Sequence, residues 1–138
     1  MTDVQPKQMQ NLFTVMLVDD DPMQVAYFCA VLTALGVTDM MTSNSGSDAI
    51  SQIENAEKKP DLLICDLLMP EMDGFDMMSQ LADKKITMPI IVISSQSQTV
   101  RKSASILATI KSLNFLGELE KPVDLAALKV LLDKVRNI

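Results

Sequence analysis

The chain has 138 residues, a formal net charge of −6 and 48% hydrophobic residues, which is enough apolar material for one folded domain. The acidic balance argues against a nucleic-acid-binding surface, which needs clustered lysine and arginine. No apolar run approaches the roughly 20 residues of a membrane span, and the start, MTDVQPKQMQ, does not resemble a signal peptide. We therefore expect a cytoplasmic domain over residues 12–138, preceded by an N-terminal extension of residues 1–11, without direct contact to nucleic acid or membrane.

Short apolar runs predict the strands. Most of these runs are continuous rather than alternating, as in parallel strands that are buried on both faces. The second run is the weakest of the set. In chain order the expected strands are FTVMLV (13–18), DMMTS (39–43), LLIC (62–65), IIVI (90–93) and FLGEL (115–119).

A helical pattern follows each expected strand. In the first helix, Asp21 is placed as the N-cap, Pro22 at the first helical position and Gly36 at the end. Asp124 is placed to cap the last helix. The later helices are expected over 47–59, 74–85, 99–113 and 124–138. Five alternations of strand and helix predict an α/β fold of the (βα)5 type, with right-handed crossovers and helices on both faces of one parallel sheet.

Polar residues follow the strands, where the carboxyl ends of a parallel sheet form its ligand-binding edge. The set comprises Asp19 and Asp20 after the first strand, Asp66 after the third, Ser94 and Ser95 after the fourth, and Lys121 and Pro122 after the fifth. Adjacent carboxylates repel one another at neutral pH, so the cluster requires a cation or good solvation.

Over residues 12–138 the sequence resembles the receiver domain of bacterial response regulators. The resemblance is carried by LVDDDP (17–22), DLLICDLLMPEMDGFD (61–76), PIIVISS (89–95) and EKP (120–122). It implies a doubly wound, flavodoxin-like three-layer sandwich with a five-stranded parallel sheet in the order 2-1-3-4-5. It also implies a two-component signalling switch rather than an enzyme. Such a phosphoprotein accepts a phosphoryl group from a sensor histidine kinase or a histidine phosphotransfer protein and then controls an output domain or a partner protein.

The resemblance also implies the roles of the acidic residues. Asp66 is the implied phosphoacceptor. Asp20 and Asp66, together with the backbone carbonyl of Leu68, are expected to ligate Mg²⁺ directly, and Asp19 is expected to act through water. Mg²⁺ prefers such hard oxygen ligands.

The remaining site residues are implied in the same way. Ser94, in preference to Ser95, is expected to hydrogen-bond a phosphoryl oxygen, and Lys121 to pair with the phosphoryl group. Three residues are expected to shape loops rather than to react: Pro70, Gly74 and Pro122. For Gly74 we expect backbone angles that are closed to other residues, and Asp73 is placed to cap the following helix.

The segment before the lysine departs from many receivers. Glu118 stands where many of them carry an aromatic residue, and 27 positions separate Ser94 from Lys121 (121 − 94). This longer segment resembles receivers attached to cyclic-di-GMP phosphodiesterase domains. We expect residues 96–120 to carry the conformational change to the output domain or partner, since both ends of the segment adjoin the site.

Two other functions fit parts of the pattern. Asp19-x-Asp21 matches the Asp-x-Asp of haloacid-dehalogenase-type phosphatases, but no acidic pair follows Lys121 and Asp66 would have no role. A receiver-like module that binds a partner without phosphorylation would not need the complete acidic set.

Histidine and cysteine limit the chemistry further. Without histidine the chain has no histidine ligand, no histidine base and no phosphohistidine of its own. Cys29 and Cys65 are too few for a disulfide framework or a zinc site. We interpret both as reduced core residues, with a redox role for Cys65 beside Asp66 as the alternative.

Overall fold

The computed structural model describes residues 12–136, so the expected extension over 1–11 and the last two residues of the expected final helix lie outside it. The described chain contains one sheet of five parallel strands in the order β2-β1-β3-β4-β5. Its strands are β1 (Thr14–Val18), β2 (Asp39–Ser43), β3 (Leu62–Asp66), β4 (Ile90–Ser94) and β5 (Phe115–Glu120). The expected flavodoxin-like fold and its strand order are confirmed.

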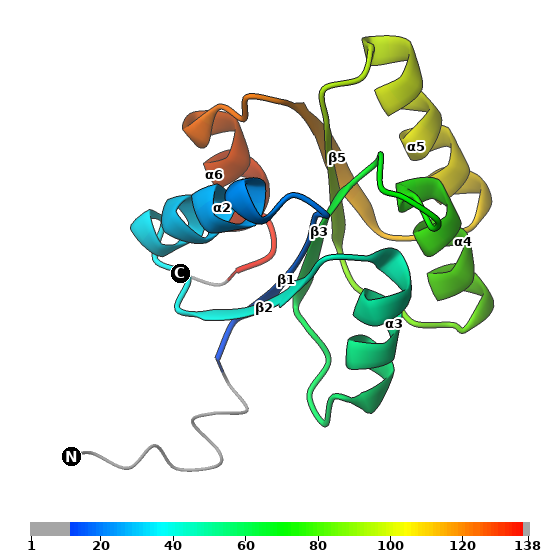
Figure 1. The fold of residues 1–138 in the computed structure, drawn as a ribbon, viewed down its shortest axis with the longest axis horizontal. Coiled ribbons are helices and arrows are strands. Elements are labelled where there is room, and N and C mark those ends of the chain that lie inside the picture. Colours follow the sequence, from blue (N-terminus) through cyan, green and yellow to red (C-terminus); the bar gives the residue numbers. More distant parts are fainter. Residues whose placement is uncertain (1–11, 137–138) are drawn as a thin grey trace.

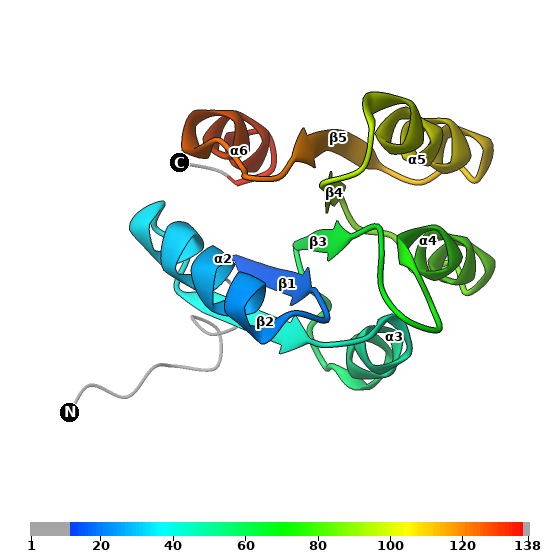
Figure 2. The same ribbon diagram turned by 45° about the horizontal axis from the view of Figure 1, so that its top comes forward.

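Helices cover both faces of this sheet, as Figures 1 and 2 show. One face carries α2 (Pro22–Ala34) and α6 (Leu125–Asp133). The other carries α3 (Gly46–Asn55), α4 (Gly74–Asp83) and α5 (Gln98–Ile110). The molecule therefore has three layers, with the sheet in the middle.

Two apolar layers hold the sandwich together, one on each face of the sheet. Every residue of β1, β3 and β4 is buried, which explains why these strands are continuous apolar runs. The edge strands β2 and β5 are mostly half-buried. Partial exposure tolerates polar residues, and this is why the sequence pattern of β2 is weak.

The predicted helix starts lie within one residue of the observed ones, and the predicted caps are confirmed. The side chain of Asp21 accepts a hydrogen bond from the amide of Met23 at 3.0 Å, with Pro22 directly after the cap. Asp73 caps α4 and Asp124 caps α6 in the same way. Gly36 follows the C-cap of α2 with a φ of +94°, the left-handed conformation that glycine adopts without strain.

The predicted helix ends are wrong by several residues. The helix α3 ends at Asn55 and does not reach residue 59, because the C-cap Ala56 has an extended backbone; the ammonium of Lys59 donates to the carbonyl of Ile53 at 2.7 Å. Lys85 and Ser112 adopt left-handed backbone conformations just after α4 and α5. Because neither residue is a glycine or an asparagine, the sequence offers no signal for these stops. The last helix ends at Asp133, before residue 138.

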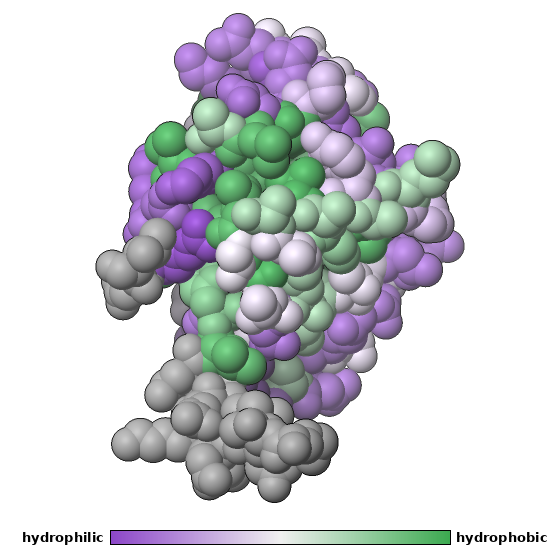
Figure 3. Space-filling view, turned by 90° about the vertical axis from the view of Figure 1, so that its left-hand side faces the viewer, coloured by the Kyte–Doolittle hydropathy of each residue, from purple (hydrophilic) through white to green (hydrophobic). Residues whose placement is uncertain are grey.

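The outer surface of α2 is unusually apolar. The helix contains no charged residue, and Met23 and Tyr27 are 80% and 46% exposed. Figure 3, which views the side of the molecule on which α2 and α6 lie, shows apolar residues spread across this face. Within residues 12–136, no helix combines the length and the apolar character needed to span a bilayer.

Candidate functional site

Three aspartates converge where β1 and β3 end. One carboxylate oxygen from each of Asp19, Asp20 and Asp66 lies within 4.8 Å of the others. Asp19 follows β1 directly, Asp66 is the last residue of β3, and the two strands are neighbours in the sheet. The cluster expected from the sequence is thus assembled by the parallel pairing of two strands.

Burial differs sharply within the cluster. Asp19 and Asp66 are 1% and 7% exposed, whereas Asp20 lies at the surface. Both oxygens of Asp19 are engaged, because Oδ1 accepts from the amide of Asp21 at 3.0 Å and Oδ2 lies 3.2 Å from Lys121 Nζ. The carboxylate of Asp19 is therefore held in place before any ligand binds.

Lys121 supplies the positive charge of the site. Its Nζ lies 3.2 Å from Asp19 Oδ2 and 3.3 Å from Asp66 Oδ2. The backbone amide of Lys121 donates to the carbonyl of Ser94 at 2.9 Å, which ties the end of β5 to the end of β4. The peptide bond between Lys121 and Pro122 is cis.

The protonation equilibria of Asp66 and Lys121 are both perturbed. Burial raises the pKa of the Asp66 carboxyl and the Asp19 charge raises it further, so that the opposing effect of Lys121 does not return it to its ordinary value. Burial by itself lowers the pKa of the Lys121 ammonium. The charges and hydrogen bonds of Asp66 and Asp19 together outweigh burial, and the net pKa of Lys121 is raised.

The hydroxyl of Ser94 is buried at the end of β4. Ser94 is 1% exposed, and its Oγ accepts a hydrogen bond from the amide of Gln96 at 2.9 Å. Ser95 is exposed and lines a cavity beside Lys121 and Pro122. Both serines therefore lie near the lysine, and the preference for Ser94 as the phosphoryl-sensing residue stays a prediction.

The loop after Asp66 folds back onto that residue. The amide of Leu68 lies 3.4 Å from Asp66 Oδ1, and the Leu68 side chain is exposed. The carbonyl of Pro70 accepts from the amide of Met72 at 2.8 Å, which closes a tight turn. Glu71, between them, has a φ of +67°.

The expected reason for Gly74 is wrong. Gly74 is the first residue of α4, and the positive φ values lie elsewhere in the described chain, at Gly36 and three non-glycine residues. A Cβ at Gly74 would lie 2.9 Å from the carbonyl oxygen of Asp66 and 3.0 Å from Leu67 Cα. The position needs glycine because α4 approaches the backbone of Asp66 and Leu67 so closely.

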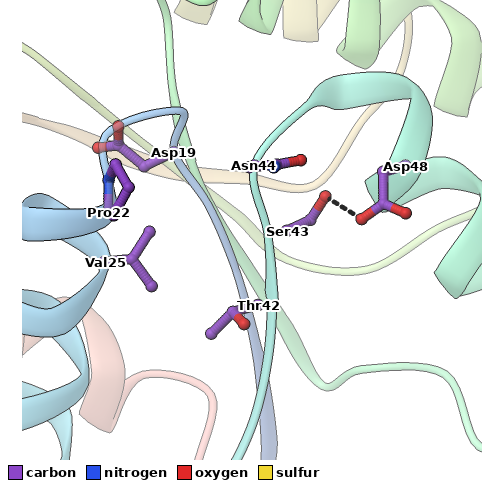
Figure 4. A pocket seen from close by; sticks show the side chains of 7 residues that line it. All are labelled: Asp19, Pro22, Val25, Thr42, Ser43, Asn44 and Asp48. Atoms are coloured by element: carbon purple, nitrogen blue, oxygen red, sulfur yellow. Dashed lines mark hydrogen bonds between the residues drawn. The ribbon is translucent and has the colours of Figure 1, made fainter.

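A second cavity lies beside the acidic cluster at the β1–β2 edge (Figure 4). Its polar groups already bind one another: Ser43 Oγ donates to Asp48 Oδ2 at 2.6 Å, and Gln52 donates to the same oxygen at 2.7 Å. These two hydrogen bonds lower the pKa of the Asp48 carboxyl. Sequence reasoning missed Asp48, although Ser45-x-x-Asp48 matches the start of a capping box. Its contacts fix the start of α3 rather than extend the site.

The remaining candidates have structural roles. Burial, with smaller effects from the charges of Asp66 and Asp73, raises the pKa of the Cys65 thiol to about 12. Such a thiol is not ionised at neutral pH and behaves as a core residue. Asp21 caps α2 and does not join the acidic cluster, so the Asp-x-Asp motif of a dehalogenase-type phosphatase is not assembled.

Comparisons with known proteins agree with this geometry. Residues 15–133 match the response regulator receiver domain family. The probable C4-dicarboxylate response regulator DctR of Bacillus subtilis is 28% identical over 89% of this chain and 52% of its own length. A protein-glutamate methylesterase/protein-glutamine glutaminase of Clostridium acetobutylicum is 29% identical over 83% of this chain and 33% of its own length. The chain thus spans about half or a third of the length of these relatives.

Solved structures show the same fold. A putative response regulator from Chloroflexus aurantiacus aligns with a TM-score of 0.74 and 28% identity, over 91% of this chain and 98% of the other. The chemotaxis protein CheY4 of Vibrio cholerae aligns with a TM-score of 0.73 and 23% identity, over 91% and 99% of the two chains.

Proposed function

Because the chain belongs to the response regulator receiver domain family, we propose that Asp66 accepts a phosphoryl group from the phosphohistidine of a sensor histidine kinase or a phosphotransfer protein. The observation that carries this assignment is the position of Asp66. Asp66 ends the central strand β3 and lies within the acidic cluster, with its Oδ2 3.3 Å from Lys121 Nζ. In the transfer, a carboxylate oxygen of Asp66 bonds to phosphorus, and the phosphorus–nitrogen bond breaks with its electron pair going to the donor histidine.

The donor set of the cluster fits Mg²⁺. Three carboxylate oxygens lie within 4.8 Å of one another, and hard cations of this size bind to oxygen ligands. The proposed ligands are Asp20, Asp66 and the Leu68 carbonyl, with Asp19 acting through water. When bound, the ion neutralises charge on the transferring phosphoryl oxygens. The proposed role of Lys121 is to pair with the incoming phosphoryl group, and its Nζ, 3.2 Å from Asp19 Oδ2 and 3.3 Å from Asp66 Oδ2, supports this role.

The apolar outer face of α2 supports docking of a phosphodonor protein. Met23 lies one helical position after Pro22 and is 80% exposed, and Tyr27 follows one turn later on the same helix. Exposed apolar patches of this kind mark protein interaction sites. This face adjoins the loop that carries Asp19 and Asp20, so a donor helix bound there would bring its phosphohistidine to the acidic cluster.

We propose that the output leaves through residues 96–120. The segment is anchored at both ends, because the carbonyl of Ser94 binds the amide of Lys121 at 2.9 Å. The helix α5 within it presents Ile106 and Ile110, which are 55% and 72% exposed. Movement of Ser94 and Lys121 toward a phosphoryl group would therefore shift an apolar surface that an output domain or partner can read.

Labelling with a small-molecule donor tests the phosphoacceptor. With Mg²⁺ and acetyl phosphate, the protein should gain one phosphoryl group that is stable in acid and lost in base. Asp66→Asn should abolish the labelling, and EDTA should block it. Asp73→Asn is the matched control, because this residue lies in the same loop and caps α4 through an oxygen that asparagine also supplies. Wild-type labelling of the Asp66→Asn variant would refute the assignment.

A further inference from the structure

A carboxylate on β5 has an unsatisfied, buried oxygen. Oε2 of Glu118 is the only buried side-chain nitrogen or oxygen without a hydrogen-bond partner in the part of the chain that the structure describes. Buried polar atoms are almost always paired in folded proteins, so an unpaired one calls for an explanation. Glu118 as a residue is half-buried, and Oε2 is a part of it that solvent does not reach.

The guanidinium of Arg101 lies on the same side of the sheet. Side chains alternate along a strand, and Leu119 packs on the α2–α6 side. Glu118 and Glu120 consequently face α5, which carries Arg101 in its first turn. Arg101 contacts Glu120, with Nη2 3.6 Å from Oε2, but this partner is 66% exposed whereas the Arg101 side chain is only 11% exposed.

Arg101 is also connected to the candidate site. Its Nη1 donates to the carbonyl of Gln96 at 2.6 Å. The amide of the same Gln96 donates to Ser94 Oγ at 2.9 Å. Arg101 thus holds the turn whose amide holds the Ser94 hydroxyl, without itself reaching Asp66.

We propose that Arg101 is a positioning residue with two alternative partners. In the resting protein it holds the Gln96 carbonyl and thereby orients the Ser94 hydroxyl. When Ser94 donates to a phosphoryl oxygen, the turn at Gln96 moves, and Arg101 shifts along β5 to pair with the Glu118 oxygen. This inference rests on the proposed function, since it needs a phosphoryl group at Asp66.

The exchange follows from the different contacts that Arg101 makes in the resting and in the occupied state. A guanidinium has five N–H donors in a planar fork, so Arg101 can exchange the Gln96 carbonyl and the exposed Glu120 carboxylate for the Glu118 carboxylate and stay paired with a negative charge. Pairing with Glu118 satisfies an oxygen that is unsatisfied in the resting state. The gain occurs only in the occupied state, which is the condition for a ligand to shift a conformational equilibrium.

A double-mutant cycle between Arg101→Gln and Glu118→Gln tests the exchange. The first measurement is the affinity for beryllofluoride, an unreactive phosphoryl mimic, determined by calorimetry with Mg²⁺ present. Each single variant should weaken binding by about fivefold, and the double variant should be no weaker than either single one, because both remove the same contact. The second measurement is thermal stability in EDTA without beryllofluoride. Here the effects of Arg101→Gln and Glu118→Gln on the melting temperature should be independent, and Glu118→Gln should not lower it.

Glu57→Gln is the control. It makes the same chemical change at an exposed carboxylate between α3 and β3, away from Arg101, and should change beryllofluoride affinity by less than about twofold. Independent, multiplying effects of Arg101→Gln and Glu118→Gln on beryllofluoride affinity would overturn the exchange. Coupling of equal size in the resting protein would overturn it too, since the pair would then be a fixed structural contact. If the wild type itself fails to bind beryllofluoride, the proposed function fails and the inference with it.

Discussion

The Lys121 ammonium lies 3.3 Å from the Asp66 carboxylate, although 55 positions separate the two residues in the chain. The same nitrogen lies 3.2 Å from Asp19. Two buried carboxylates therefore share one cation, the Lys121 ammonium.

Replacing this cation should destabilise the resting protein. Lys121→Gln leaves Asp19 and Asp66 buried without a positive partner, at a cost of about 1–3 kcal/mol in the free energy of unfolding at neutral pH. The loss should be smaller with Mg²⁺ present, because the ion then supplies positive charge. Urea unfolding with EDTA and with Mg²⁺ measures both values.

An exposed lysine provides the control for this experiment. Lys129 pairs with Asp133 at 2.6 Å on the surface of α6. Lys129→Gln should cost only about 0.5 kcal/mol or less, and equally in both conditions. A Lys121→Gln effect as small as this one, or one that Mg²⁺ leaves unchanged, would contradict the shared-cation arrangement.

Asp20 and Asp21 are neighbours with opposite expected responses to Mg²⁺. Asp20→Asn should lower Mg²⁺ affinity by at least about tenfold. It should raise stability without metal by no more than about 0.5 kcal/mol, because Asp20 is exposed. Asp21→Asn should leave Mg²⁺ affinity unchanged, since this side chain caps α2 and asparagine caps equally well. Titration calorimetry with MgCl₂ compares them, and equal losses in both variants would argue against Asp20 as a ligand.

The raised pKa of Asp66 predicts a pH-dependent effect of Asp66→Asn in EDTA. A carboxyl whose pKa is raised on folding contributes stability below its unfolded pKa of about 3.9, and loses that contribution as the pH rises through the folded pKa. The neutral asparagine has no such loss. Asp66→Asn should therefore be more stable than the wild type at pH 7, and the difference should shrink as the pH falls toward 4. Chemical denaturation between pH 4 and pH 7 measures the free energy of unfolding of both proteins. A difference between them that grows on acidification would contradict a raised pKa for Asp66.

Alanine substitutions at Gly74 and Gly46 test the close approach of α4 to the loop after Asp66. Gly74→Ala places a methyl group against backbone atoms of Asp66 and Leu67, which cannot move aside, so we expect a loss of about 1–3 kcal/mol. It should also slow labelling by acetyl phosphate, because the clash displaces Asp66. The new methyl group in Gly46→Ala meets the side chain of Met72 at 2.9 Å, together with the Met72 carbonyl at 3.2 Å. The flexible thioether can yield, so this variant should cost less and label at the normal rate.

The sequence by itself determined what depends on near neighbours in the chain. Continuous apolar runs marked β1, β3 and β4 because a strand buried on both faces has no polar side. The sequence was sufficient to predict the helix caps Asp21 and Asp124, because each side chain accepts from the backbone amide two residues later in the chain. The convergence of Asp19, Asp20 and Asp66 followed from strand ends and parallel topology, without knowledge of any distance.

Only the tertiary structure decided what depends on the approach of distant segments. Gly74 is required because a helix start meets the backbone at Asp66, and no local pattern encodes that contact. The last carbonyls of α3 bind the ammonium of Lys59, which lies outside the helix. The sequence could not predict that Arg101, Gln96 and Glu118 are related. The hydrogen bond between Arg101 and Gln96 and the unsatisfied oxygen of Glu118 exist only once α5 packs on β5. Local patterns specify elements and their order, whereas burial and pairing are properties of the assembled sandwich.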